Sequence, residues 1–228
     1  MVLPKVNGCA SDHGFILRCP IISSLSVTTP QLRPSRAKAK PAKPTLTPTP
    51  TPPMTKFAAI DFETANHSRD SACALGVVIV EHGRIVRCLH QRIRPPSREF
   101  TFTYIHGLSW DDVKDAPRFD VVWAGMAREL EGVAFLAAHN APFDKGVLDA
   151  CCDTYDLPSP EQPFVCTVQL ARAQWNIHPT KLPDVCHHLG IDLRHHQADS
   201  DAEACARIVM AALQAGWRYR IKQDSSAV

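Results

Sequence analysis

The chain has 228 residues, of which 45% are hydrophobic and 21% are charged. These proportions allow a packed core, exclude wholesale disorder and suit one domain of ordinary size with an appendage. No stretch approaches the ~18 uninterrupted apolar residues that a membrane-spanning helix needs, so we expect no membrane span.

The formal net charge of +2 hides a division along the chain. Residues 1–56 contain eight basic residues and one acid, a net charge of +7, whereas residues 57–228 contain 17 basic and 22 acidic residues, a net charge of −5. An acidic body is unusual for a nucleic-acid-binding protein unless metal ions neutralise some of its carboxylates.

Residues 1–55 are expected to form a disordered tail rich in Pro, Thr and Lys, because eight prolines fall within residues 30–53 and favour extended, solvated chain. The basic, nearly acid-free composition also fits an organellar transit peptide, and Met54 leaves a later start codon open. The tail could hold phosphate backbones electrostatically, but we favour a solvated linker.

The nine cysteines are odd in number and form no C-x-x-C pair. Several lie inside apolar runs, so they are interpreted as reduced core residues rather than as a disulfide framework or a zinc site. This usage favours a reducing compartment, and we expect a cytoplasmic protein, with organellar targeting by residues 1–55 left open.

The hydrophobic pattern predicts an α/β domain that begins near Lys56. Its order is a strand, a two-stranded hairpin, a helix, a strand, a helix, a strand and three helices, which implies a mixed sheet with helices packed on it. The expected segments are 56–61 (strand), 71–95 (two strands around the turn 81–84), 117–131 (helix), 133–139 (strand), 140–153 (helix), 164–175 (strand turning into helix), 181–190 (helix) and 198–215 (helix).

Local signals support the helix ends. Pro117 and Gly132 suit the first helical position and the residue after a helix, respectively. Asn140 is expected to cap the helix that begins beside Pro142, and Gly190 to end the helix before it.

Asp61 and Glu63 stand two residues apart at the end of the first strand. Residues i and i+2 of a strand share one face, so both carboxylates should project to the same side. Two such charges at a buried strand end repel each other unless a cation or a proton intervenes, although both could instead be solvated beyond the strand.

Asp144 and Asp201 each lie in the first turn of a helix and in line with its apolar stripe. A first-turn acid is also favoured by the helix dipole, which is the simpler interpretation of either residue alone. His196 precedes Asp201 by five residues in the loop that enters the last helix, and the adjacent His195 is expected to be an ordinary surface residue.

Taken together, four inward carboxylates without matching bases would be very costly to bury. Two hard divalent cations, Mg²⁺ or Mn²⁺, would resolve this, because these metals prefer carboxylate ligands and a metal pair can clamp both oxygens of an in-line phosphoryl displacement. A neutral His196 could then accept a proton from the attacking water.

Three motifs resemble, in order and spacing, those of the DEDDh 3′→5′ exonucleases. They are IDFET (60–64), HNAPFD (139–144) and HHQADSDAEA (195–204). The family includes the proofreading epsilon subunit of bacterial DNA polymerase III and ribonuclease T, and the resemblance covers about residues 56–215. It is specific, because four acids and the spacing from His196 to Asp201 must coincide with the right local structures.

The resemblance implies a ribonuclease-H-like fold over residues 56–215, with a mixed five-stranded sheet and flanking helices, followed by a C-terminal tail (216–228). It implies hydrolysis of 3′-terminal phosphodiesters of single-stranded DNA or RNA to nucleoside monophosphates, with two divalent cations. By position, the implied metal ligands and catalytic acids are Asp61, Glu63, Asp144 and Asp201, and the implied general base is His196.

The resemblance also suggests substrate contacts. The segment YIHGL (104–108) is similar to one that lies against the terminal nucleotide in relatives. Phe62 and Thr64 flank the strand acids, but Phe62 could be plain core, and Asn140 could cap its helix, touch substrate or both. The candidate substrate contacts are Phe62, Thr64, Ile105, His106, Gly107 and Asn140.

Two departures from the family are visible. Many relatives carry Gly shortly after the first motif, whereas residues 64–68 (TANHS) hold none, which leaves the loop shape open. About a dozen residues follow the domain without an evident polymerase-docking segment, so we expect a stand-alone or loosely attached nuclease and treat association with a DNA polymerase as unsupported.

Two other functions remain open at this stage. A non-catalytic nucleic-acid-binding or adaptor module could use the same fold, but its signature would be a lost acid or His, and all five are present. An endonuclease is the other alternative. Neither the sugar preference, the oligomeric state nor the pathway follows from the sequence.

Overall fold

The computed structural model describes residues 56–219. The tail predicted over residues 1–55 lies outside the described residues, and so do residues 220–228 of the predicted C-terminal tail. The strands are β1 (Phe57–Thr64), β2 (Ala72–Glu81), β3 (Arg84–Arg92), β4 (Leu136–Ala138) and β5 (Phe164–Cys166). The helices are α1 (Thr103–His106), α2 (Trp110–Val113), α3 (Phe119–Glu129), α4 (Ala141–Thr154), α5 (Thr167–Trp175), α6 (Leu182–Leu189) and α7 (Ala198–Gln214).

The five strands form one mixed sheet in the order β3-β2-β1-β4-β5. β2 pairs antiparallel with both β1 and β3, whereas β4 runs parallel to β1 and to β5. The hairpin turns through His82 and Gly83, both with positive φ, as the sequence pattern predicted. β1 therefore lies at the centre, where its end is reached from both faces of the sheet.

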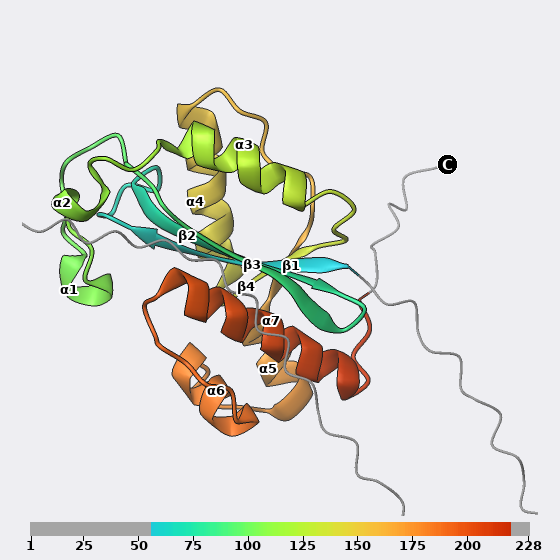
Figure 1. Cartoon of the computed structure of the whole chain (residues 1–228). Coiled ribbons are helices and arrows are strands. Elements are labelled where there is room, and N and C mark those ends of the chain that lie inside the picture. The colour runs from blue at the N-terminus through green and yellow to red at the C-terminus, as the bar shows by residue number, and fades with distance from the viewer. Residues whose placement is uncertain (1–55, 220–228) are drawn as a thin grey trace, which may run out of the picture. The chain divides into compact units, whose positions relative to one another are not determined.

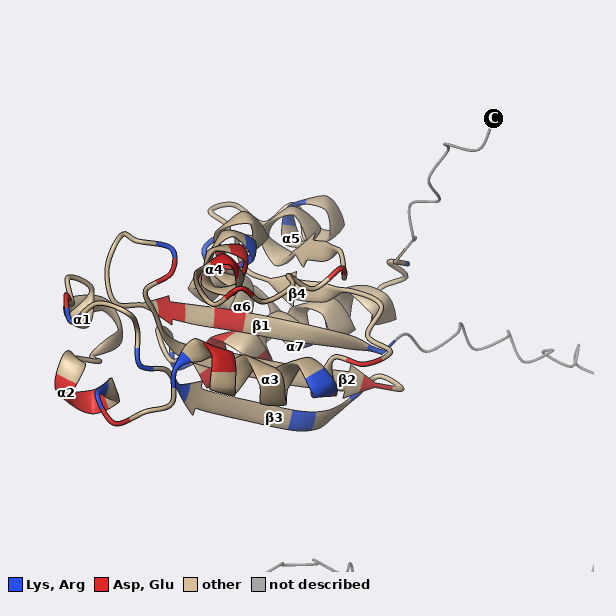
Figure 2. Cartoon of the chain, turned by 90° about the horizontal axis from the view of Figure 1, so that it is seen from above, with Lys and Arg blue, Asp and Glu red and all other residues tan. Residues whose placement is uncertain are grey.

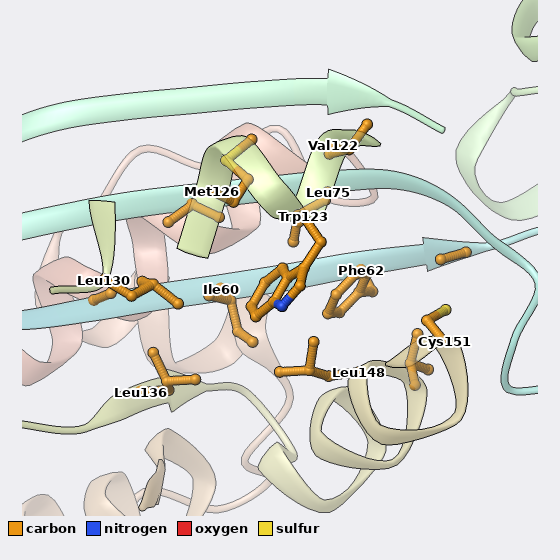
Figure 3. Packing of buried hydrophobic residues seen from close by; sticks show 14 of the residues in the cluster. Ile60, Phe62, Leu75, Val122, Trp123, Met126, Leu130, Leu136, Leu148 and Cys151 are labelled. Atoms are coloured by element: carbon orange, nitrogen blue, oxygen red, sulfur yellow. The ribbon is translucent and has the colours of Figure 1, made fainter. Parts of the chain in front are cut away.

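Each face of the sheet has its own hydrophobic core. Even-numbered residues of β1, such as Ile60 and Phe62, pack with α3 and α4 on one face (Figure 3). Odd-numbered residues, such as Phe57 and Ala59, pack with α5, α6 and α7 on the other face. Figure 1 shows this layering, with α3 and α4 above the sheet and α5–α7 below it. The alternation of β1 thus decides which helices its side chains meet.

The structure departs from the sequence expectations in three details. α3 begins at Phe119 rather than at Pro117, because Arg118 is extended, and it ends at Glu129 before Gly132. Two short helices, α1 and α2, lie in the connection between β3 and α3, for which the sequence pattern predicted no element. Asn140 occupies the N-cap position of α4, but it has φ 64° and its side chain makes no capping hydrogen bond.

No helix among residues 56–219 is both long enough and apolar enough to cross a membrane.

Gly76 permits the start of α7 to lie directly on the sheet. It sits on β2 opposite Asp61 of β1. A Cβ at this position would lie 2.0 Å from the carbonyl oxygen of Ala198 and 2.8 Å from the amide nitrogen of Asp199, both backbone atoms at the start of α7. Any larger residue would therefore push α7 away from β1 and β2.

We expect Gly76→Ala to lower the free energy of unfolding by about 1–3 kcal/mol or more, because overpacking here meets backbone rather than a flexible side chain. Urea denaturation measures the effect. Gly125→Ala is the matched control: Gly125 lies in α3 with nothing within 4 Å of an added Cβ, so this change should be neutral or stabilise by up to ~1 kcal/mol. Equal stability of the two variants would contradict the close approach.

Candidate active site

The end of β1 presents Asp61 and Glu63 to the same face, as the i, i+2 spacing predicted. That face is the one covered by α7. The register of β1 against β2 shifts between Glu63 and Thr64, which is an irregularity of the kind often found beside functional sites. Glu63 is 8% exposed, so the carboxylate is buried rather than solvated beyond the strand.

Asp144 approaches the same place from α4, on the opposite face of the sheet. It is 2% exposed, and its Oδ1 accepts a hydrogen bond from the backbone N–H of Phe62 at 3.1 Å. Asn140, just before the helix, adopts the left-handed conformation that Asn tolerates better than most residues. The tight entry into α4 thus directs its first turn toward β1.

Asp201 approaches from α7 and is 3% exposed. Its Oδ2 accepts hydrogen bonds from the backbone N–H of His196 at 3.1 Å and from Nδ1 of His195 at 2.9 Å. Its Oδ1 is buried without a hydrogen-bond partner among the described residues. A buried oxygen without a partner is costly, and it indicates that a ligand belongs beside it.

The carboxylates form one cluster. One oxygen each from Asp61, Glu63 and Asp201 lie within 4.8 Å of one another. Asp144 is not in that set of three, but it is tied to the same strand through Phe62 and interacts electrostatically with Asp61. Figure 2 shows acidic bands near the tip of β1, where the strand approaches the helices.

Burial raises the pKa of all four acids, and repulsion from neighbouring acids adds to this at Asp61, Glu63 and Asp144. Burial, followed by the charges of Asp144, Asp201 and Glu63, raises the pKa of Asp61 well above its ordinary value. Burial and the charge of Asp201 raise the pKa of Glu63 to about 7. Burial raises the pKa of Asp144 to about 8, although the N–H of Phe62 opposes this, and burial also raises that of Asp201. Four ionised carboxylates are therefore unfavourable at this position unless a cation binds beside them.

These residues fit a site for hard divalent cations. Carboxylate oxygens are the ligands that Mg²⁺ and Mn²⁺ prefer. A cation beside Asp201 Oδ1 would satisfy the oxygen that lacks a partner, and it would offset the repulsion that helps to raise the pKa values of Asp61, Glu63 and Asp144.

The two adjacent histidines lie at the rim of the cluster. His196 has φ 66°, an uncommon left-handed conformation, and its ring stacks on that of His195 at a centroid distance of 3.8 Å. Burial and the neighbouring His195 lower the pKa of His196, so the imidazole is neutral at pH 7 and able to accept a proton. His195 is exposed, as expected of a surface residue, but it also contacts Asp201 through Nδ1, which the sequence did not predict.

A cleft of about 790 Å³ opens above the cluster. The segment around α1 contributes Phe102 and Ile105 to its lining, which we call the apolar wall. α5 and the start of α6 contribute Arg172 and Lys181, which we call the basic wall. Asp61, Glu63 and Asp201 line the same cleft.

The predicted substrate contacts are only partly brought together. Thr64, Ile105, His106 and Asn140 line the cleft, whereas Gly107 does not. Gly107 instead ends α1 with φ 78°. These assignments remain predictions.

Phe62 and His106 have structural tasks of their own. The Phe62 side chain is 4% exposed and packs near Leu148 and Cys151 in the core (Figure 3), so the alternative interpretation as core fits the side chain, although the residue also borders the cleft. The His106 ring uses both nitrogens: Nε2 lies 3.1 Å from the Thr64 carbonyl oxygen, and Nδ1 accepts from the Leu108 N–H at 3.1 Å. This ring holds the loop around α1 against the end of β1.

Sequence reasoning missed several residues of the cleft, namely His139, Arg172, Thr180 and Lys181. His139 was visible as the first letter of the second motif, directly before Asn140. Arg172 and Lys181 lie on a helix and at a helix start that the sequence predicted, but nothing in the pattern indicated that they face the acids.

The family model described as exonuclease matches residues 58–209, about two thirds of the chain, and this span includes all four acids and both histidines. This chain belongs to the DEDDh exonuclease family. The similarity deduced from the three motifs is thereby confirmed, and a hydrolytic nuclease activity follows from membership.

The DEDDh exonuclease described here is similar to longer curated proteins. It is 32% identical over 158 residues to the PolC-type DNA polymerase III of Latilactobacillus sakei subsp. sakei (strain 23K). The aligned region covers 65% of this chain and 11% of that protein. It is 31% identical over 163 residues to the PolC-type DNA polymerase III of Oceanobacillus iheyensis, with 69% and 11% covered. The chain thus spans about a tenth of the length of these relatives.

Solved structures confirm the ribonuclease-H-like fold. The nuclease domain of 3′hExo, a DEDDh family member bound to rAMP, has a TM-score of 0.65 at 21% identity and covers 75% of this chain and 97% of that one. Exonuclease X in complex with 5′ overhanging duplex DNA has a TM-score of 0.60 at 24% identity, with 71% and 94% covered.

The raised pKa values predict an unusual pH dependence of the metal-free protein. Glu63 and Asp144 bind protons more tightly in the folded chain than in the unfolded chain, where their pKa values lie near 4. Their contribution to stability is therefore fully present below about pH 4 and is lost as the pH rises through 7 and 8. In EDTA, the melting temperature should fall between pH 5.5 and pH 8.5.

Two comparisons check this interpretation. Adding Mg²⁺ should raise the melting temperature more at pH 8.5 than at pH 5.5, because the cation binds the ionised carboxylates. Asp144→Asn, which keeps the shape but cannot ionise, should flatten the profile in EDTA. A melting temperature that rises with pH over this range in EDTA would show that the acids are not buried together.

Proposed function

We propose that this chain is a metal-dependent 3′→5′ exonuclease that hydrolyses the terminal phosphodiester of single-stranded DNA, or of RNA, and releases nucleoside monophosphates. The observation that carries the proposal is the cluster of Asp61, Glu63 and Asp201, with a buried Asp201 oxygen that lacks a partner, at the base of an open cleft. Asp61, Glu63, Asp144 and Asp201 would hold two divalent cations, Mg²⁺ or Mn²⁺.

The bound cations would supply charge stabilisation to the attacking and leaving oxygens of an in-line displacement. The residues of the chain perform the remaining steps. His196, neutral at pH 7, takes the proton of the attacking water as its oxygen bonds to phosphorus. The bond from phosphorus to the 3′ oxygen of the preceding nucleotide breaks, and that oxygen takes up a proton from solvent. The products are a shortened strand with a free 3′ hydroxyl and a nucleoside 5′-monophosphate.

The shape of the cleft supports a strand end as the substrate. Phe102 and Ile105 offer an apolar surface on which the terminal base can stack or pack, with Thr64 beside it. Base stacking is tolerant of sequence, so this wall favours an exonuclease that acts on any terminal nucleotide.

The similarities support nucleic acid of either sugar. The similar proteins include a DNA polymerase, an exonuclease in complex with DNA, and a 3′-exonuclease with 3′-end-specific recognition of a histone mRNA stem-loop. A matched pair of DNA and RNA oligonucleotides, degraded side by side, decides between the sugars.

The first test is degradation of a 5′-labelled oligonucleotide. With Mg²⁺ or Mn²⁺ we expect a ladder of products shortened stepwise from the 3′ end, and no product in EDTA. Asp61→Asn and Asp201→Asn should each reduce the rate below detection, because each removes a carboxylate from the cation site. Full activity in both variants would overturn the assignment.

Asp149→Asn is the matched control, since Asp149 lies on α4 and forms a surface ion pair with Lys145 away from the cluster. Its activity should equal that of the wild type. A circular single strand should remain intact, and cleavage of the circle would replace the exonuclease by an endonuclease.

A further prediction concerns the proton acceptor. His196→Ala should lower kcat by roughly 10²–10⁴-fold, the usual contribution of a general base. In the wild type, the acid limb of the kcat/KM profile should lie below the ordinary His pKa of about 6.5, because burial lowers the pKa of His196. His90→Ala, an exposed His on β3, serves as the control. If His196→Ala leaves both kcat and the pH profile of kcat/KM unchanged, the general base is another residue.

A further inference from the structure

The cleft contains two basic side chains that the reaction described above does not use. Arg172 and Lys181 are the Lys and Arg residues that line it. Within residues 56–219, neither lies within 4.0 Å of a carboxylate, whereas seven other Lys and Arg side chains do: Lys56, Arg87, Lys114, Arg118, Lys145, Arg194 and Arg207. Two cations are thus left available in a cleft whose base is acidic.

Arg172 is held in place by its inner nitrogen. Its Nε donates to Thr180 Oγ1 at 2.9 Å, and that hydroxyl donates in turn to the Ile177 carbonyl at 2.9 Å. Thr180 is 7% exposed, so this support is built into the fold. The two outer nitrogens of Arg172 make no hydrogen bond within the described residues, and this leaves the edge of the guanidinium that binds phosphate in a bidentate manner.

The loop that carries Thr180 and Lys181 is tied to the catalytic side of the sheet. His139, just after β4, has Nε2 at 3.0 Å from the Thr180 carbonyl and Nδ1 at 2.8 Å from Thr167 Oγ1. A carbonyl only accepts, so Nε2 carries the proton and Nδ1 accepts from the Thr167 hydroxyl. This connection fixes the basic wall relative to the second motif.

Lys181 occupies the N-cap position of α6. A cation at a helix N-terminus is opposed by the helix dipole, which favours an anion there. Asp184 offers partial compensation, but its Oδ2 accepts the backbone N–H of Lys181 at 3.1 Å. Lys181 lines the cleft and has no carboxylate within 4.0 Å among the described residues, so an anion placed in the cleft would be attracted to its ammonium group.

We propose that Arg172 and Lys181 bind backbone phosphates on the 5′ side of the scissile bond and so make the enzyme select strands over mononucleotide esters. This inference rests on the proposed exonuclease function. The acids and their cations take the scissile phosphate, and the wall of Phe102 and Ile105 takes the terminal nucleoside. The remaining wall is basic, whereas residues 57–228 carry a net charge of −5, so the next phosphates are attracted to this wall alone within the cleft.

The first experiment compares two substrates. On a single-stranded oligonucleotide, Arg172→Ala and Lys181→Ala should each raise KM roughly tenfold, with kcat within about twofold of the wild type, because they remove a charged contact to a remote phosphate. On the p-nitrophenyl ester of thymidine 5′-monophosphate, which has no upstream phosphate, neither change should alter kcat or KM. Arg128→Ala removes the same charge from an exposed position of α3 and should change nothing.

The second experiment locates the contact. A neutral methylphosphonate is introduced at one linkage at a time, counted from the 3′ end. In the wild type, a methylphosphonate at the second or third linkage should raise KM. In the double variant Arg172→Ala/Lys181→Ala, a methylphosphonate at the same linkage should leave KM unchanged. The dependence of affinity on salt, measured with the Asp61→Asn variant, should become shallower by about 0.7 in log–log slope for each contact removed.

The outcomes separate the two proposals. If the wild type hydrolyses neither substrate with Mg²⁺ or Mn²⁺, the proposed exonuclease function is contradicted. A wild type that hydrolyses both, with variants whose KM for the oligonucleotide is unchanged, would overturn only the phosphate-binding role. Equal losses on the oligonucleotide and on the ester would also overturn it, because they would show that the basic wall supports the catalytic centre instead.

Discussion

The structure depends on the crowding of four carboxylates at the end of one buried strand. Asp61, Glu63, Asp144 and Asp201 come from three separate segments. Burial raises the pKa of each, and repulsion from neighbouring acids adds to this at Asp61, Glu63 and Asp144. Such an arrangement weakens the folded state at neutral pH unless cations offset the charge. The protein therefore gives up stability at this place to hold ligands that hard cations require, and the unpartnered Asp201 oxygen is the local sign of that compromise.

The fold meets this constraint by approaching β1 from both faces. α4 brings Asp144 from one side and α7 brings Asp201 from the other, so neither helix has to displace the other. Each helix enters near a residue with positive φ, Asn140 or His196, and backbone strain of this kind is tolerated where the surroundings dictate it. Gly76 completes the geometry, because only a residue without Cβ lets α7 come close enough to the sheet for its carboxylate to join those of β1.

The sequence predicted the acids because each obeys a local rule. The i, i+2 spacing placed two carboxylates on one face of β1, and the helical period aligned the other two with apolar stripes, so the mixed sheet and the acidic cluster followed from periodicity and motif spacing. What it could not predict depends on contacts between distant segments. His195 meets Asp201 through the path of one loop, α1 and α2 are short helices fixed by the packing of their connection, and Arg172 faces the cleft because Thr180 holds its Nε. No periodic signal encodes such contacts.

The electrostatics of the cleft imply that divalent cations and a nucleic-acid strand, the two ligands of the proposed function, would bind cooperatively. Without bound metal ions, Asp61, Glu63 and Asp201 repel the phosphates of an approaching strand. The positive side chains of Arg172 and Lys181 are then the Lys and Arg charges of the cleft that attract the strand, in a body whose net charge is negative. In the proposed exonuclease, divalent cations held by these carboxylates would make the same walls attractive to the strand, and a strand bound there would favour cation binding in return. By linkage, each ligand must raise the affinity of the other by the same factor. The acidic body is thus compatible with nucleic-acid binding. The bound cations would supply the positive field that a strand requires, and they would supply it at the catalytic site.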